Sequence, residues 1–309
     1  MNPNADNSAR LAARLAISKT PKVYVGGAFI RSESGRVAPL LDSARRFVAQ
    51  IPQCTRKDLR NAVEAAATAG PGWARRTPYN RGQILYRLAE MLESRAREMA
   101  EAIRLDGHTG LPRAQREVAA ACDRLVYFAG WADKFEQVLG NTNPVASPHF
   151  NFTVCEPMGV VGVVAGHAAP LLGLVSQIAP ILVSGNTVVA HASERSPYPA
   201  IVLGEILAVA DFPGGVVNLL TGQRRELLPT FATHAHIRAI DAVVHDPAEK
   251  KTLGIGAAGS VKRMKYREAF QGTAVNAADL SWFDAEAHES VYAIREFIEF
   301  KTTWHPIGA

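Results

Sequence analysis

The sequence predicts an α/β fold in which helices cover both faces of a largely parallel sheet. The first observation is a nearly continuous apolar run over residues 160–165, which is typical of a strand buried on both faces of such a sheet. The second is that similar runs recur at 187–190, 216–220 and 237–244, separated by stretches long enough for helices. Right-handed crossover connections are the default topology for strands of this kind.

The composition predicts a soluble protein with ample length for a core. The 309 residues are 48% hydrophobic, and no apolar run is long enough to cross a bilayer, so we expect one large domain or two modest ones. The net charge of +5 comes from 34 basic and 29 acidic residues that are scattered through the chain. Without a basic stripe and interleaved aromatic residues, neither a nucleic-acid partner nor a membrane is predicted.

The cysteines indicate a reducing compartment. Cys54, Cys122 and Cys155 lack CxxC spacing and leave one thiol unpaired in any disulfide scheme, so we expect a cytoplasmic protein without a zinc site. Cys122 falls on the apolar stripe of a predicted helix, and we interpret it as a buried small hydrophobe rather than a reactive thiol.

The N-terminal part is expected to supply an arm, a hairpin and a first helix. Residues 1–21 are arginine-containing and poor in acids, which favours a helical or mobile arm, with a transit peptide as the alternative. Residues 22–36 alternate apolar side chains around a Gly-Gly pair, as a hairpin does. Thr55 and Asp58 form a capping-box pattern that starts a helix running through Ala69.

Two long helices are predicted next. Apolar residues recur at helical spacing from Ile84 to Ile103, and Gly107 follows as a stop signal. A second stripe runs from Val118 to Phe135.

Two further segments are predicted to be extended. Residues 141–152 are rich in Asn, Pro, Ser and aromatic residues, which indicates a connection or an extended ribbon. Near the end of the chain, Ile298, Phe300 and Trp304 alternate with polar residues up to Pro306, which predicts a strand with one apolar face. Because such a strand is an aggregation hazard when it is unpaired, we expect a partner to cover it.

Four loops follow the predicted parallel strands and are the candidate functional segments. In open α/β sheets, ligands sit outside the carboxyl ends of the strands. The loops at these ends are Gly166–Pro170, His191–Glu194, Thr221–Arg224 and His245–Asp246.

The order of these segments resembles one known family. The successive stretches GVVGVV, APLLGLVSQIAPILVSGNTVV, SERSPYPAIVLGEIL and PGGVVNLLTG are similar to the Rossmann-like cofactor domain of the aldehyde dehydrogenase superfamily. The resemblance covers residues 22–250 and 290–307. It implies NAD(P)-dependent oxidation of an aldehyde through a cysteine thiolate, an oxyanion donor and a general base.

The resemblance also implies a division of the chain. Residues 22–250 would form the NAD(P)-binding-like α/β domain, with an oligomerisation ribbon at 141–154. Residues 251–289 would be a residual linker where the family carries its catalytic domain. Residues 290–309 would hold the C-terminal oligomerisation strand.

Several positions depart from the family's cofactor-binding pattern. The second loop keeps Ser193 and Glu194 of the family's Lys-Pro-Ser-Glu but has His191 in place of the Lys. These three residues and Gly222 are the candidate, vestigial cofactor-binding residues, and the alternative is that His191 and Glu194 merely meet solvent. Arg224 and Leu228 replace family glycines, which predicts bulk where the backbone would approach the phosphates. NAD or NADP binding is therefore expected to be weak or absent.

The catalytic positions depart as well. Ala168 stands where the family has an oxyanion-donating Asn, and a loss of that kind costs about 10²- to 10³-fold in rate. The family's general base falls near Tyr266–Glu268, where Arg267 is no base and Glu268 serves only after a shift of register. The fourth loop has His245 in place of the family's Gly-Ser turn, and His245–Asp246 is expected to cap a helix. No cysteine follows Cys155, and none lies in the family's nucleophile motif, so no catalytic residue is predicted.

Two further features have simple interpretations. The Gly254–Gly259 segment matches G-x-G-x-x-G but follows lysines rather than a buried strand, so we expect a flexible helix or loop. His167 is expected to be a loop or partly buried histidine rather than a catalytic base.

The leading functional hypothesis is a non-catalytic accessory subunit. The chain looks like the truncated second unit of two-unit aldehyde dehydrogenases, and its partner would be a full-length aldehyde dehydrogenase subunit, or a second copy of itself. The alternative is an NAD(P)-dependent oxidoreductase acting on the aldehyde group of donors. A decayed remnant is the third possibility, although the regular helix stripes favour a chain that folds.

Overall fold

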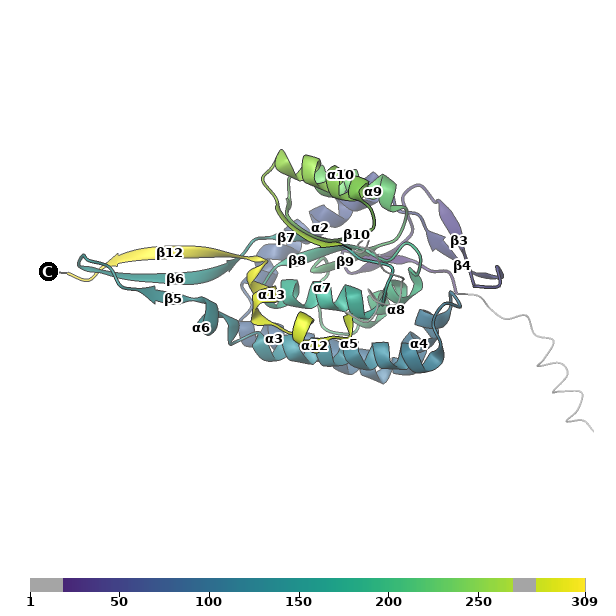
Figure 1. The fold of residues 1–309 in the computed structure, drawn as a ribbon, viewed down its shortest axis with the longest axis horizontal. Coiled ribbons are helices and arrows are strands. Elements are labelled where there is room, and N and C mark those ends of the chain that lie inside the picture. Colours follow the sequence, from purple (N-terminus) through teal and green to yellow (C-terminus); the bar gives the residue numbers. More distant parts are fainter. Residues whose placement is uncertain (1–18, 269–281, 309) are drawn as a thin grey trace, which may run out of the picture.

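A seven-stranded sheet forms the centre of the molecule in the computed structural model, which describes residues 19–268 and 282–308 (Figure 1). Its strand order is β11-β10-β7-β8-β9-β1-β2, and the first five of these strands run parallel. β1 pairs antiparallel with β9, and β2 closes the predicted N-terminal hairpin against β1. The strands are β1 (Val23–Val25), β2 (Ala28–Ile30), β7 (Val160–Val164), β8 (Thr187–His191), β9 (Val217–Leu220), β10 (Ile237–Val244) and β11 (Arg263–Glu268). The predicted α/β class is confirmed.

Helices cover both faces of this sheet, and each face has its own core (Figure 1). One face carries α3 (Pro78–Ser94), α4 (Ala96–Arg104), α5 (Leu111–Trp131), α7 (Leu172–Val183) and α8 (Tyr198–Leu207). The other carries α2 (Arg56–Ala74), α9 (Arg224–Thr233) and α10 (Pro247–Ala258). The strands between them are buried on both sides, which explains their uninterrupted apolar sequences.

Local signals in the sequence set most helix boundaries. Thr55 and Asp58 form the predicted capping box at the start of α2, which continues five residues beyond the predicted end, to Ala74. The predicted helix over Ile84–Ile103 is divided into α3 and α4 at Arg95. The G-x-G-x-x-G segment lies at the end of α10, where a Cβ on Gly256 would come within 2.5 Å of Ala232 Cβ. That glycine therefore serves the close packing of α10 on α9.

A three-stranded ribbon projects from the body of the molecule (Figure 1). We define the ribbon as β5 (Asn141–Asn143), β6 (His149–Pro157) and β12 (Ile298–Pro306). β12 pairs antiparallel with β6 along its whole length, from Ile298 opposite Pro157 to Pro306 opposite His149. The tail strand and the predicted ribbon thus form one unit. A smaller hairpin of β3 (Val37–Leu41) and β4 (Phe47–Pro52) lies elsewhere on the body.

Parts of the expected linker over 251–289 form regular structure among the residues that the structure describes. α10 and β11 occupy residues 247–258 and 263–268, and β11 extends the parallel sheet beside β10. The sequence of β11 is highly charged, so periodicity did not predict a strand there. After it, α12 (Ala285–His288) and α13 (Val291–Arg295) lead to the ribbon. The predicted N-terminal arm lies mostly outside the described residues.

Within the described residues, no helix is both long enough and apolar enough to span a membrane.

Candidate functional site

The candidate site is the crevice at the carboxyl ends of β7 and β10. The chain goes from β7 to β8 and β9 on one side, whereas β10 and β11 lie on the other, so the strand order reverses between β7 and β10. A switch point of this kind is where open α/β sheets bind their ligands. All four predicted loops reach this edge of the sheet.

Arg224 lies in the middle of this crevice. Its Nη1 donates to Ala165 O at 2.8 Å and its Nη2 donates to Val243 O at 2.6 Å, so one guanidinium joins the ends of β7 and β10. Its Nε and Nη2 also donate to the two carboxylate oxygens of Glu249 at 2.7 and 2.9 Å. The residue is only 4% exposed. The bulk predicted at this position is therefore present and bonded to both strands.

Leu228, the second predicted bulky residue, lies elsewhere. It is buried in the core on the α9 face of the sheet.

Two carboxylates surround Arg224. Glu194 Oε2 accepts the backbone N–H of Arg224 at 2.9 Å, at the beginning of α9. Glu249, in the first turn of α10, also accepts the backbone N–H of His245 at 2.8 Å. Burial raises the pKa of Glu249, but the hydrogen bond from Arg224 and the bond from His245 outweigh it and leave the pKa lowered. Glu249 is therefore an ionised partner, and no sequence motif marks it.

Two histidine rings lie parallel beside this ion pair. His167 and His245 stack with their centroids 4.0 Å apart and an interplanar angle of 4°. Burial, followed by the charges of His245 and Arg224, lowers the pKa of His167 to about 3. Burial and the charge of Arg224 also lower the pKa of His245. Both rings are consequently neutral near pH 7, and His167 is the partly buried loop histidine that we expected.

The predicted cofactor-binding residues are grouped around the crevice but contact other protein groups. His191 is 1% exposed, and its Nε2 donates to Gly222 O at 2.8 Å. Ser193 Oγ accepts the backbone N–H of Ser196 at 3.2 Å and lies 3.3 Å from His167 Nδ1. Glu194 is occupied by Arg224, as described above. Their role in cofactor binding remains a prediction.

A dinucleotide makes specific demands on a crevice of this kind. Its pyrophosphate must approach the strand ends and the helix N-termini closely. Here a guanidinium bonds to the strand ends, and carboxylates occupy the first turns of α9 and α10. The residues present do not fit a pyrophosphate at this position.

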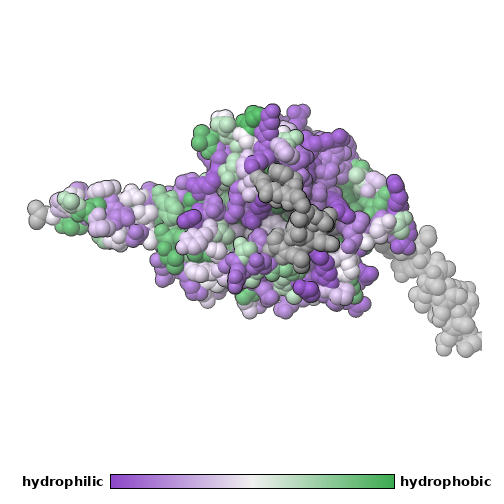
Figure 2. Space-filling view, viewed as in Figure 1, coloured by the Kyte–Doolittle hydropathy of each residue, from purple (hydrophilic) through white to green (hydrophobic). Residues whose placement is uncertain are grey.

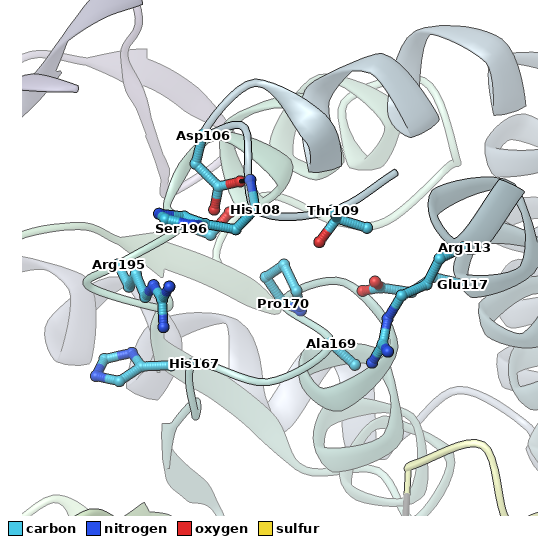
Figure 3. A pocket seen from close by; sticks show the side chains of 10 residues that line it. All are labelled: Asp106, His108, Thr109, Arg113, Glu117, His167, Ala169, Pro170, Arg195 and Ser196. Atoms are coloured by element: carbon cyan, nitrogen blue, oxygen red, sulfur yellow. Dashed lines mark hydrogen bonds between the residues drawn. The ribbon is translucent and has the colours of Figure 1, made fainter. Parts of the chain in front are cut away.

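A separate pocket of about 270 Å³ lies on the other side of His167 (Figure 3). It is lined by Asp106, His108, Thr109, Arg113, Glu117, His167, Ala169, Pro170, Arg195 and Ser196. Buried Glu117 accepts the backbone N–H groups of Leu171 and Leu172 at 2.8 and 3.2 Å, so a carboxylate from α5 covers the N-terminus of α7. Ala168, beside this pocket wall, offers no side-chain donor.

None of the three cysteines lines this pocket, and Cys54 lies beside the crevice, where its backbone N–H donates to Thr221 O at 3.0 Å. Cys54 and Cys122 are buried, and burial raises the pKa of each thiol to about 12. Cys155 lies in the ribbon, where burial raises its pKa to about 11. The interpretation of Cys122 as a small hydrophobe agrees with this placement. Among the described residues, no cluster of His, Cys, Asp and Glu could hold a metal ion.

A buried polar network lies beneath the crevice, and sequence reasoning missed it. Asp241, within β10, binds Arg267 of β11 and Gln177 of α7. Arg267 also lies over the ring of Trp282, with 5.2 Å from its Cζ to the ring centroid. A carboxylate inside an otherwise apolar strand was the signal that could have revealed this network. The position expected for a general base, near Arg267, is thus part of an ion pair.

Comparison with known proteins gives consistent matches. The model of the aldehyde dehydrogenase family matches residues 29–266. Retinal dehydrogenase 2 of Mus musculus is 32% identical over 307 residues, covering 93% of this chain and 58% of that protein. Hydroxyisobutyraldehyde dehydrogenase of Mycolicibacterium austroafricanum is 35% identical over 221 residues, covering 71% of this chain and 43% of that protein.

Solved structures agree with the fold. HpcC from Thermus thermophilus superposes with a TM-score of 0.76 at 31% identity, covering 80% of this chain and 48% of that one. The NAD⁺ complex of aldehyde dehydrogenase from Bacillus cereus gives a TM-score of 0.77 at 24% identity, with 87% and 53% covered. The chain therefore spans about half the length of the proteins that it matches.

Proposed function

Because this chain belongs to the aldehyde dehydrogenase family, we propose that it is a non-catalytic accessory subunit that assembles with a full-length NAD(P)-dependent aldehyde dehydrogenase. The contact would be made by the ribbon. The proposed assembly is cytoplasmic, as expected for a chain with free thiols.

The observation that carries this proposal is the exposure of apolar side chains on both faces of the ribbon. Opposed residues in an antiparallel pair share a face, so Phe300 and Trp304 of β12 lie on one face with Cys155 of β6. Phe150 and Val154 of β6 lie on the other. Phe300 is 47% exposed and Trp304 is 56% exposed. The sequence predicted one apolar face, and the second is contributed by β6.

The shape of the ribbon supports docking to another protein. It extends beyond the body and carries apolar side chains at its surface (Figure 2). Within the described residues, β12 pairs with β6 alone, which leaves the outer edge of β12 available to a further strand. Exposed apolar faces and an unpaired strand edge promote aggregation of a solitary chain, but they stabilise an interface with another protein.

The site supports the non-catalytic part of the proposal. Cys122 and Cys155 lie outside the crevice, and Cys54, next to Thr221, is buried with its thiol pKa raised to about 12. Arg224 occupies the position where a pyrophosphate would approach the sheet. A subunit of this kind contributes surface and stability to an assembly, while its partner supplies the cofactor site and the nucleophile.

Co-expression with a full-length aldehyde dehydrogenase from the same source, followed by native mass spectrometry, tests the proposal. We expect a hetero-oligomer that Trp304→Glu weakens at least tenfold, because a buried charge replaces an anchoring aromatic side chain. Tyr79→Glu on α3 is the matched control, since Tyr79 is 64% exposed but lies outside the ribbon. A stable monomer, or a homo-oligomer that ignores the dehydrogenase, would overturn the assignment.

Cofactor titration separates this proposal from the oxidoreductase alternative. Heat from NAD or NADP binding, together with aldehyde-dependent reduction of the nicotinamide by the isolated chain, would support an enzyme. The accessory role predicts neither signal.

A further inference from the structure

We propose that Arg224 is a permanent internal ligand that takes the place of a dinucleotide in the crevice and determines that the chain does not bind one. The inference concerns the crevice alone and does not depend on assembly through the ribbon. It follows from what Arg224 bonds to, what surrounds it, and how deeply it is buried.

Arg224 satisfies the hydrogen-bonding groups at two strand ends. Ala165 O and Val243 O lie at the carboxyl ends of β7 and β10, the two strands that flank the switch point. Buried carbonyl groups need donors. The guanidinium of Arg224 donates to both, at 2.8 and 2.6 Å, and therefore bridges the gap into which a ligand would insert.

Carboxylates already occupy the helix N-termini at this crevice. The N-terminus of a helix attracts anions, and phosphates use this property. Glu194 accepts the first backbone N–H of α9, and Glu249 accepts the N–H of His245 just before α10. Two carboxylates already satisfy donors that a phosphate would need, and they would repel it.

Arg224, Glu249 and His245 hold one another in place through hydrogen bonds. Glu249 holds Arg224 through two hydrogen bonds, and His245, whose N–H binds Glu249, is covered by the ring of His167. Removal of Arg224 alone would leave the charge of Glu249 unpaired in the crevice. Opening the crevice to a pyrophosphate therefore requires the removal of both side chains.

The test is dinucleotide binding by the double variant Arg224→Gly/Glu249→Ser. Titration calorimetry with NAD and with NADP should show no binding heat for the wild-type chain and measurable binding for the double variant, with an association constant at least tenfold above the detection limit. Arg224→Gly alone should bind more weakly than the double variant, because Glu249 stays behind as a repelling charge.

Arg104→Gly/Glu101→Ser is the matched control. This pair is also an Arg–Glu ion pair, with 3.1 Å between Nη1 and Oε2, but it lies on the exposed surface of α4, away from α9 and α10. The control should bind no dinucleotide. A double variant of the crevice that keeps the wild-type circular dichroism and a cooperative melt but gains no binding would overturn the proposal.

The wild-type chain provides a second test that is independent of how the variants fold. Ligands that bind the native state raise the melting temperature. If millimolar NAD or NADP stabilises the wild-type chain, Arg224 does not exclude the dinucleotide and the inference is wrong. Loss of hetero-oligomer formation would leave this result untouched, and it would count only against the accessory role.

Discussion

Arg267 of the edge strand β11 forms a two-bond ion pair with Asp241, which lies within the neighbouring strand β10 and is completely buried. Nε donates to Oδ1 at 2.8 Å and Nη2 donates to Oδ2 at 2.9 Å. Gln177 Nε2 adds a third bond to Oδ1 at 3.1 Å. β11 therefore joins the sheet through a side-chain pair as well as through its backbone.

Asp241→Asn is expected to destabilise the chain by about 3–5 kcal/mol, because it leaves the largely buried guanidinium of Arg267 without its counter-charge. Urea unfolding followed by circular dichroism measures this change. The control is Glu299→Gln, which breaks the exposed pair with Arg263 and should cost less than about 1 kcal/mol. Equal effects of the two substitutions would contradict the role given to Asp241.

Arg124 attaches residues 282–289 to α5 and α7. Its Nη2 donates to Trp282 O at 3.2 Å, its Nη1 donates to Ser176 Oγ at 2.6 Å, and its Nε donates to Glu289 Oε1 at 3.1 Å. Arg124→Met should therefore increase amide hydrogen exchange over residues 282–297 more than elsewhere. Arg104→Met, an exposed substitution on α4, should leave that exchange unchanged. If exchange over residues 282–297 is the same in Arg124→Met as in the wild-type chain, Arg124 does not hold this segment.

The sequence predicted the elements that depend on local signals. The strands β7 to β10 and the capping box at Thr55 depend on residues that are close together in the sequence. Apolar runs therefore identify the strands, and the Thr55–Asp58 spacing identifies the helix start. β11 has no such signal, because its charged side chains are neutralised by groups far away in the chain, as Arg267 is by Asp241. Tertiary pairing of this kind cannot be read from a single strand.

The same distinction applies to the site. The position of Arg224 after β9 predicted bulk at the strand ends, and the structure places it there. Its main partner, Glu249, is 25 residues away and reaches the crevice only because α10 follows β10 at the switch point. Residue type and loop order therefore indicated the obstruction, while the fold was needed to show the bonds that fix it.

Cys155 is expected to react slowly with thiol reagents. Burial and, to a lesser extent, the charge of Glu136 raise its pKa to about 11. Near neutral pH its thiolate fraction is then about 100-fold below that of the same thiol at its ordinary pKa of 9.0. Iodoacetamide labelling of the native chain, compared with the chain in concentrated guanidinium chloride, measures the difference. Rapid labelling of any thiol in the native chain would indicate a reactive thiolate and would support a cysteine nucleophile in this chain.

Buried neutral histidines predict a loss of stability in mild acid. Burial lowers the pKa of His191 from 6.5 to about 4, so the unfolded chain takes up a proton at a pH where the native chain does not. Stability is therefore greatest above about pH 6.5 and falls as the pH approaches 4, by up to about 1.4 kcal/mol per pH unit for this residue. His167 and His245 have lowered pKa values too and act in the same direction.

His191→Gln isolates the share of His191 in this effect. An amide in place of the ring can still donate to Gly222 O but cannot be protonated in this range. Between about pH 7 and about pH 5, the unfolding free energy should therefore fall less steeply with pH in the variant. The difference in slope should correspond to about one proton, or up to about 1.4 kcal/mol per pH unit. If the His191→Gln slope equals that of the wild-type chain, the native state accepts the proton at His191 and the buried ring is not held neutral.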